Sequence, residues 1–162
     1  MLKGMCGGVR YLKRFNMDAG RFHEHILQAC KTYRGTVSLL DEYRSIPEVG
    51  VALAPNFFSD LGYKEFCKPD VHVCAIINGL EGTNYDEQQV FERMLCLAKE
   101  SGVPPRQLDK VFYLAGSGNF YLAGKSIGDK WDGPQRRKAL IEHLRISQGT
   151  KLEPLNIQID SD

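Results

Sequence analysis

The sequence predicts an all-α protein, a single helical bundle, and three observations support this prediction. Apolar residues recur three and four positions apart along most of the chain, as on one face of an amphipathic helix. Glycines and prolines separate these periodic segments, at positions where such residues end or begin helices. The 162 residues, 43% hydrophobic and 25% charged, suffice for one domain with its own core. We expect residues 1–150 to form a single helical domain and residues 151–162 a tail.

Helices are predicted on both sides of a short turn in the first half of the chain. Asp18 can cap a helix that runs through Tyr33 and that Gly35 ends, and residues 37–45 have helical spacing of their apolar side chains. A tight turn follows at residues 47–50. The next helix is expected from about residue 52 to residue 61, where Gly62 can end it in a left-handed conformation. The prediction over about residues 37–61 is therefore helix, hairpin, helix.

The second half of the chain is also predicted to be helical. Asp70 can cap a helix through Ile77, and Asn84 or Asp86 can cap one that Gly102 ends. Further helices are expected from residues 104–105 to an end in Gly116-Ser117-Gly118 and from residue 134 onward, because proline is tolerated in the first helical turn and glycine favours a helix end. Residues 119–131 are rich in glycine and are expected to form a loop.

The predicted hairpin has the residues of a phosphate-binding turn. A glycine lets the backbone approach an anion, and the start of the second helix offers unpaired N–H groups and the positive end of a dipole. Contacts of this kind would position DNA without reading its sequence. The candidates for these contacts are Val49, Gly50, Val51 and Ala52.

Two segments in register carry a family resemblance. The first reads Pro47-Glu48-Val49-Gly50-Val51-Ala52-Leu53-Ala54, and the second, Asp70-Val71-His72-Val73, places Asp70 18 positions after Ala52. They resemble the Pro-Gly-Val-Gly-x-Lys-Thr-Ala hairpin and the Asp-x-His-hydrophobic step of the helix-hairpin-helix DNA glycosylase superfamily, which has the same spacing. Residues 111–118 resemble a later helix and turn of that family, so the likeness covers roughly residues 36–121.

The resemblance implies a DNA N-glycosylase-like protein of base-excision repair that binds double-stranded DNA and needs no metal or other cofactor. Asp70 would stabilise the positive charge that develops on the sugar as a flipped, damaged base leaves. The other interpretation of Asp70 is a simple N-cap for the helix after it.

Two departures from the family pattern bear on mechanism. Ala52 stands where bifunctional members carry a lysine that attacks the sugar, so a lysine-dependent lyase activity is not expected. Glu48 replaces the first hairpin glycine and adds a carboxylate beside the phosphate site. Only 69 residues precede Asp70, so the front of the family's catalytic core is expected to be missing or shortened. The alternative function is a non-catalytic helical module that binds DNA or a protein partner.

Charge and cysteine usage set further bounds. The net charge is only +1, but residues 10–34 and residues 125–151 each carry a net charge of +4. These segments can contact a phosphate backbone or can simply be solvated helix faces. The five cysteines have neither zinc-finger spacing nor the compact cluster that holds iron–sulfur centres in some relatives. We therefore expect buried free thiols, no metal site, no membrane segment and an intracellular location.

Overall fold

The all-α prediction is confirmed by a computed structural model that describes residues 2–118 and 133–148. Those residues contain eight helices and no strand. The predicted loop at 119–131 and the predicted tail at 151–162 lie outside the described residues. No helix in the described ranges has the length and apolar character required to cross a membrane.

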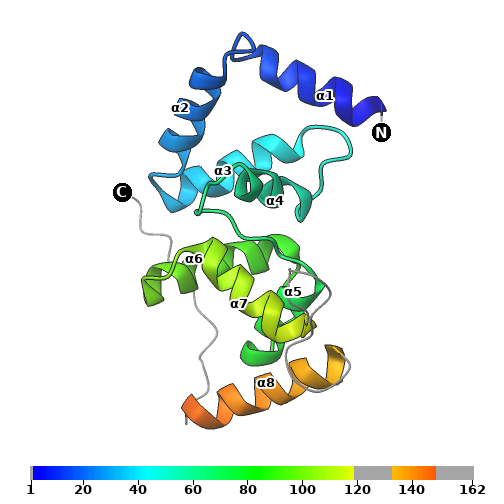
Figure 1. Ribbon diagram of the computed structural model, residues 1–162, viewed down its shortest axis with the longest axis vertical. Coiled ribbons are helices and arrows are strands. Elements are labelled where there is room, and N and C mark those ends of the chain that lie inside the picture. Colours follow the sequence, from blue (N-terminus) through cyan, green and yellow to red (C-terminus); the bar gives the residue numbers. More distant parts are fainter. Residues whose placement is uncertain (1, 119–132, 149–162) are drawn as a thin grey trace.

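The helices form two groups that follow each other along an elongated molecule, with α1 at one end and α8 at the other (Figure 1). The first group contains α1 (Leu2–Lys13), α2 (Ala19–Ala29), α3 (Tyr33–Arg44) and α4 (Leu53–Asp60). The second group contains α5 (Val71–Glu81), α6 (Glu87–Ser101), α7 (Pro105–Ser117) and α8 (Gly133–Gln148). The segment between α4 and α5 connects the two groups.

Several helix ends lie where the sequence predicts them. The side chains of Asp18, Asp70 and Asp86 accept hydrogen bonds from backbone N–H groups in the first turns of α2, α5 and α6. Gly102 and Gly118 adopt left-handed conformations after α6 and α7. These predictions are confirmed. Such caps can be predicted from the sequence because each depends on residues within three or four positions of it.

Gly35 does not end a helix, so that prediction is wrong. α2 already ends at Ala29, and α3 starts after Thr32, whose hydroxyl accepts from the N–H of Gly35 at 3.0 Å. Gly35 therefore lies in the first turn of α3. A Cβ there would sit 2.2 Å from the carbonyl oxygen of Ala29, so the close approach of α2 and α3 requires glycine.

α1 was not predicted, because it contains three glycines and has no strong helix signal. Two of them allow a close contact with the turn after α3. A Cβ on Gly7 would lie 2.8 Å from Cδ of Pro47, and one on Gly4 would lie 3.1 Å from the carbonyl oxygen of Pro47. The glycines of α1 thus serve packing against the turn, at some cost in helix propensity.

One hydrophobic cluster extends through both helix groups. Its fully or almost fully buried members include Ile26, Leu39, Leu40, Phe58, Phe66, Val73, Ile77, Val90, Phe91 and Met94. At its centre the ring of Phe58 on α4 stacks on Phe66 of the connecting segment, with centroids 4.6 Å apart. Phe66 in turn lies 6.4 Å from the ring of Phe91 on α6. This aromatic row ties the two groups together.

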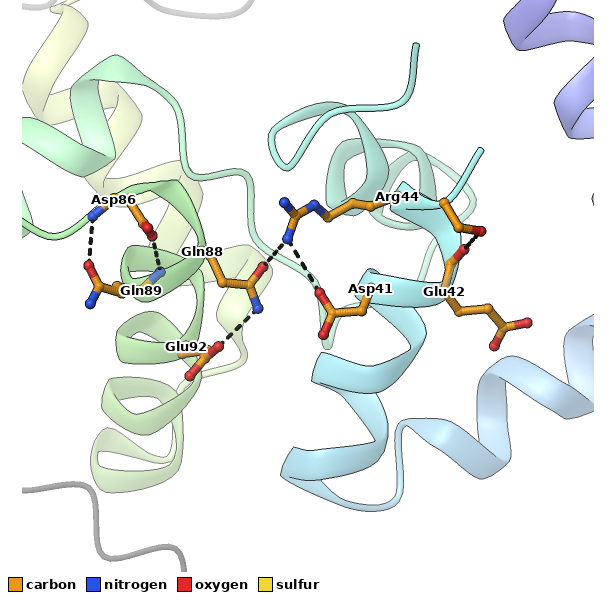
Figure 2. Close-up of polar contacts among 8 residues, drawn as sticks. Asp41, Glu42, Arg44, Asp86, Gln88, Gln89 and Glu92 are labelled. Carbon is orange, nitrogen blue, oxygen red and sulfur yellow. Dashed lines mark hydrogen bonds and ion pairs between the residues drawn. The ribbon is translucent and has the colours of Figure 1, made fainter. Parts of the chain in front are cut away.

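Polar contacts reinforce the junction of the two groups. Figure 2 shows Arg44 of α3 reaching across to α6, where its guanidinium donates to the side-chain oxygen of Gln88 at 2.9 Å. Gln88 then donates to Glu92 one turn further along α6, at 2.9 Å. Tyr33 of α3 donates to the same glutamate at 3.2 Å. The start of α3 and its end are therefore both linked to α6.

α8 packs against α5 and α7 through a small-residue contact. A Cβ on Gly79 of α5 would lie 2.3 Å from Cδ1 of Ile141, and Arg145 donates to the carbonyl oxygen of Gly79. Arg137 of α8 also bonds the ring of His72 on α5 at 2.9 Å. This packing completes the second helix group.

Candidate functional site

The predicted hairpin is a tight turn between α3 and α4. The N–H of Val49 donates to the carbonyl oxygen of Ile46 at 3.1 Å, with Pro47 and Glu48 between them. Glu48 has a φ of +68°, in the left-handed region that favours glycine. The turn therefore has the conformation that the family's glycine would suit, although a glutamate occupies it.

The start of α4 leaves backbone donors open. The carbonyl oxygen of Gly50 accepts from the N–H groups of Leu53 and Ala54, each at 3.1 Å, and no described side chain caps the helix. The N–H groups of Gly50, Val51 and Ala52 donate to no group within the described parts of the chain. Gly50 is exposed, whereas the side chains of Val49 and Val51 pack against the core. The valines thus anchor the turn from inside, and Gly50 faces solvent.

The carboxylate of Glu48 points toward α1. Its Oε2 accepts from the N–H of Gly4 at 3.2 Å, in an exposed contact. The sequence places this carboxylate beside a phosphate site, and the structure adds that it binds the first turn of a neighbouring helix. α1 therefore covers the Pro47 side of the turn.

Asp70 caps α5 with one of its two carboxylate oxygens. Oδ1 accepts from the N–H of His72 at 2.9 Å and from the N–H of Val73 at 3.0 Å. Oδ2 accepts no hydrogen bond from the described residues, and Asp70 is partly exposed. Asp70 is therefore an N-cap, as one of the two interpretations predicted, and its Oδ2 remains available to another partner. Val73 belongs to the same core as Val49 and Val51, so a common packing surface lies under both candidate segments.

A second carboxylate lies near Asp70 and was not predicted from the sequence. Asp109 of α7 is buried, and its Oδ2 accepts from the backbone N–H of Lys68 at 3.2 Å. Burial raises the pKa of Asp109 above its usual value, and the negative charge of Asp70 adds to the effect, while the Lys68 N–H acts in the opposite direction. The contact joins residues 41 positions apart, so no local pattern could have indicated it.

Asp109→Asn should be at least as stable as the parent protein at pH 7. Because the pKa of Asp109 is raised in the native state, the native state binds a proton more tightly than the unfolded chain does. The free energy of unfolding therefore falls as pH rises from the pKa of the unfolded state through that of the native state. Asparagine keeps an oxygen acceptor for Lys68 and does not titrate. In urea unfolding between pH 4 and pH 7, the free energy of unfolding of the variant should therefore increase relative to that of the parent as pH rises. Asp60→Asn, at an exposed position, should show no such pH-dependent difference.

His72 of the Asp-x-His step serves packing. Its Nδ1 is bonded to Arg137 of α8, and its ring meets the ring of Tyr113 on α7 edge-on, with centroids 5.5 Å apart. His72 therefore helps to join three helices next to Asp70.

The histidines and cysteines are the side chains that could bind a transition metal, and the sequence predicts no metal site among them. His23 bonds the hydroxyl of Tyr63 at 2.6 Å, and His25 bonds Glu42 at 3.1 Å, so the two rings have separate partners. All five cysteines are free. Cys67 is fully buried, and burial raises the pKa of its thiol. Cys30, Cys74 and Cys96 are only partly buried and Cys6 is exposed, so the prediction of buried thiols holds fully for Cys67 alone. Within the described residues, no three histidine, cysteine or acidic side chains gather into a possible metal site.

Comparison of the chain with protein-family models, with curated proteins and with solved structures finds no match. The case for a function therefore rests on the residues and geometry of the turn, the start of α4 and Asp70.

Proposed function

We propose that the protein is a DNA N-glycosylase-like protein of base-excision repair, without lysine-dependent lyase activity. The observation that carries the proposal is the combination of a left-handed turn leading into α4 with a helix-capping Asp70 whose Oδ2 is unbonded among the described residues. Both features occupy the positions that the resemblance assigns to DNA binding and to catalysis.

In this proposal the turn holds the DNA backbone. The N–H groups of Gly50, Val51 and Ala52 have no partner among the described residues, and they lie at the start of a helix, where a phosphate oxygen is favoured. Gly50 is exposed and, apart from its chain neighbours, no described heavy atom lies within 4 Å of the place where a Cβ would be, so a phosphate can approach its backbone. The contact would fix the position of the duplex and leave the choice of base to other residues.

Asp70 then acts on the glycosidic bond of a flipped base. As the bond between the base and the sugar C1′ breaks, its electrons leave with the base and positive charge develops on the sugar. A carboxylate oxygen of Asp70 stabilises that charge, the oxygen of a water bonds to C1′, and the proton that the water loses neutralises the departing base, which gives a free base and an abasic site. Ala52 has no amine, so no Schiff base forms and the strand is not cut by that route.

Asp70→Asn should lower the rate of abasic-site formation at least about 100-fold, the range found when one transition-state electrostatic contact is removed. The assay uses duplexes that carry a panel of damaged bases and detects abasic sites by alkaline cleavage. Asp86→Asn is the matched control, because Asp86 caps α6 as Asp70 caps α5 and is assigned no part in the chemistry. Equal loss of activity in both variants, or no product on any duplex, would refute an enzymatic role for Asp70.

The second candidate is a non-catalytic DNA-binding module with the same turn. Two observations favour it: the absence of a lysine at Ala52, and the carboxylate of Glu48 held at the turn by Gly4 of α1. Fluorescence anisotropy with an undamaged duplex separates the candidates. A module without activity would bind the duplex in a salt-dependent way. The Glu48→Gln variant would bind it more tightly than the parent protein, and the Asp70→Asn variant would bind it with unchanged affinity.

A further inference from the structure

A pocket of about 660 Å³ lies between the two helix groups, and neither the turn after α3 nor Asp70 contributes to its walls. The walls come from the α2–α3 junction, the first turn of α3, the connecting segment, the second half of α6 and the turn between α6 and α7. Its volume is in the range of pockets that bind small molecules, which is about 300–1,000 Å³.

Part of the pocket wall is apolar and rigidly placed. Leu95 and Ala98 belong to the buried face of α6, and the consecutive prolines Pro104 and Pro105 are the N-cap and the first residue of α7. Cys30 adds a thiol whose pKa is raised to about 12, mainly by burial, so it stays neutral and behaves as an apolar group. This wall suits a hydrocarbon chain or ring.

Four basic side chains also line the pocket. Its basic side chains are Lys31, Arg34, Lys64 and Lys99, and all four residues are exposed. None of them forms an ion pair with another described residue, and Lys31 bonds only the neutral amide of Gln28. Among the lining residues that the structure describes, Glu65 is the one carboxylate.

Two further carboxylates lie close to the pocket walls and have partners of their own. Glu92 accepts from the hydroxyl of Tyr33, and Glu100 accepts from the buried Arg93. The basic side chains of the pocket therefore outnumber the carboxylates that face them, and the local field favours an anion.

We infer that this pocket binds a small amphipathic carboxylate, with the carboxylate among the basic side chains and the apolar body against α6 and the prolines. The site goes beyond the proposed function, because DNA backbone contacts need an open basic surface and have no use for an apolar recess. A polyphosphate fits less well, because the apolar wall would desolvate charges without offering them partners.

Isothermal titration calorimetry of the full chain with sodium decanoate tests this inference. We expect one site per chain and at least tenfold weaker binding of decanol, which has the same chain without the charge. Decylamine, which is cationic at neutral pH, should not bind. Equal affinity for decanoate and decanol, or no decanoate binding at millimolar concentration, would overturn the inference.

Variants place the binding within the pocket. Lys64→Glu and Lys99→Glu reverse exposed charges and should together weaken decanoate binding at least tenfold, whereas Lys13→Glu on the distant α1 should not change it. Val103→Trp, in the turn before α7, should block the pocket, and circular dichroism checks that each variant is folded. If the reversals weakened duplex DNA binding and left decanoate binding unchanged, the basic side chains would belong to a DNA surface and the inference would be wrong.

Discussion

Replacing Arg93 with methionine should lower the free energy of unfolding by about 3–5 kcal/mol, the cost of leaving a buried charge without its partner. Nε of Arg93 on α6 donates to Oε1 of Glu81 at the end of α5, at 2.5 Å. The exposed fractions of the two side chains are 4% and 2%, so the pair is shielded from water. Methionine can fill the space of the arginine stem, but it cannot neutralise Glu81.

The expected cost depends on which partner is removed. Arg93 has a second partner in the half-exposed Glu100 at 3.3 Å, whereas Oε2 of Glu81 has no hydrogen-bond partner among the residues that the structure describes. Glu81→Leu should therefore cost less than Arg93→Met. The double variant should recover most of the loss, because an apolar pair of similar volume can replace a buried ion pair at little cost.

Urea unfolding followed by circular dichroism gives the double-mutant cycle directly. Arg44→Met is the control, because Arg44 pairs with Asp41 at the surface and such pairs contribute about 0–1 kcal/mol. If Arg93→Met cost no more than Arg44→Met, the pair between α5 and α6 would not be buried in solution.

The sequence predicts those parts of the fold that depend on near neighbours. Asp86 caps α6 by accepting from Gln89, and Gln89 bonds back to Asp86, a box written within four consecutive residues. Gly102 ends the same helix in a left-handed conformation for an equally local reason. Such elements can be located from the sequence because no distant residue is needed to form them.

Contacts between distant residues explain what the sequence did not predict. Gly35 is a residue type that commonly ends helices, yet here it allows the carbonyl oxygen of Ala29, in the preceding helix, to approach closely. α1 is helical despite its glycines, and two of these pack against Pro47 some forty residues later. Only the tertiary structure distinguishes these packing glycines from helix breakers.

The candidate site was partly predictable for the same reason. Asp70 was identified by its place before a helix and its spacing from the turn, and it does cap α5. Asp109 and the basic side chains around the pocket come from segments far apart in the chain, and no sequence pattern brought them together. When the role of a residue depends on burial and on contacts with distant residues, the sequence around it does not indicate that role.

Phe58→Ala should also lower the free energy of unfolding by about 3–5 kcal/mol, because it removes a large buried ring and leaves a cavity. Phe58 is fully buried on α4, and its ring lies 4.6 Å from that of Phe66 and 4.7 Å from that of Tyr43, centroid to centroid. It is therefore the link by which α3 and α4 join the aromatic row to the second helix group. A loss of this size should lower the melting temperature by roughly 10 °C for a chain of this length.

The neighbouring Phe57 provides the matched control for this prediction. It lies on the same helix and stacks on Tyr43 with centroids 5.1 Å apart, but 37% of it is exposed. Phe57→Ala should cost no more than about half as much as Phe58→Ala, because partial exposure leaves less apolar surface to lose. Both variants should unfold in a single transition if the core that spans the two helix groups is one cooperative unit. Equal costs for the two substitutions would mean that Phe58 does not link the groups, and the first group would then be expected to unfold separately.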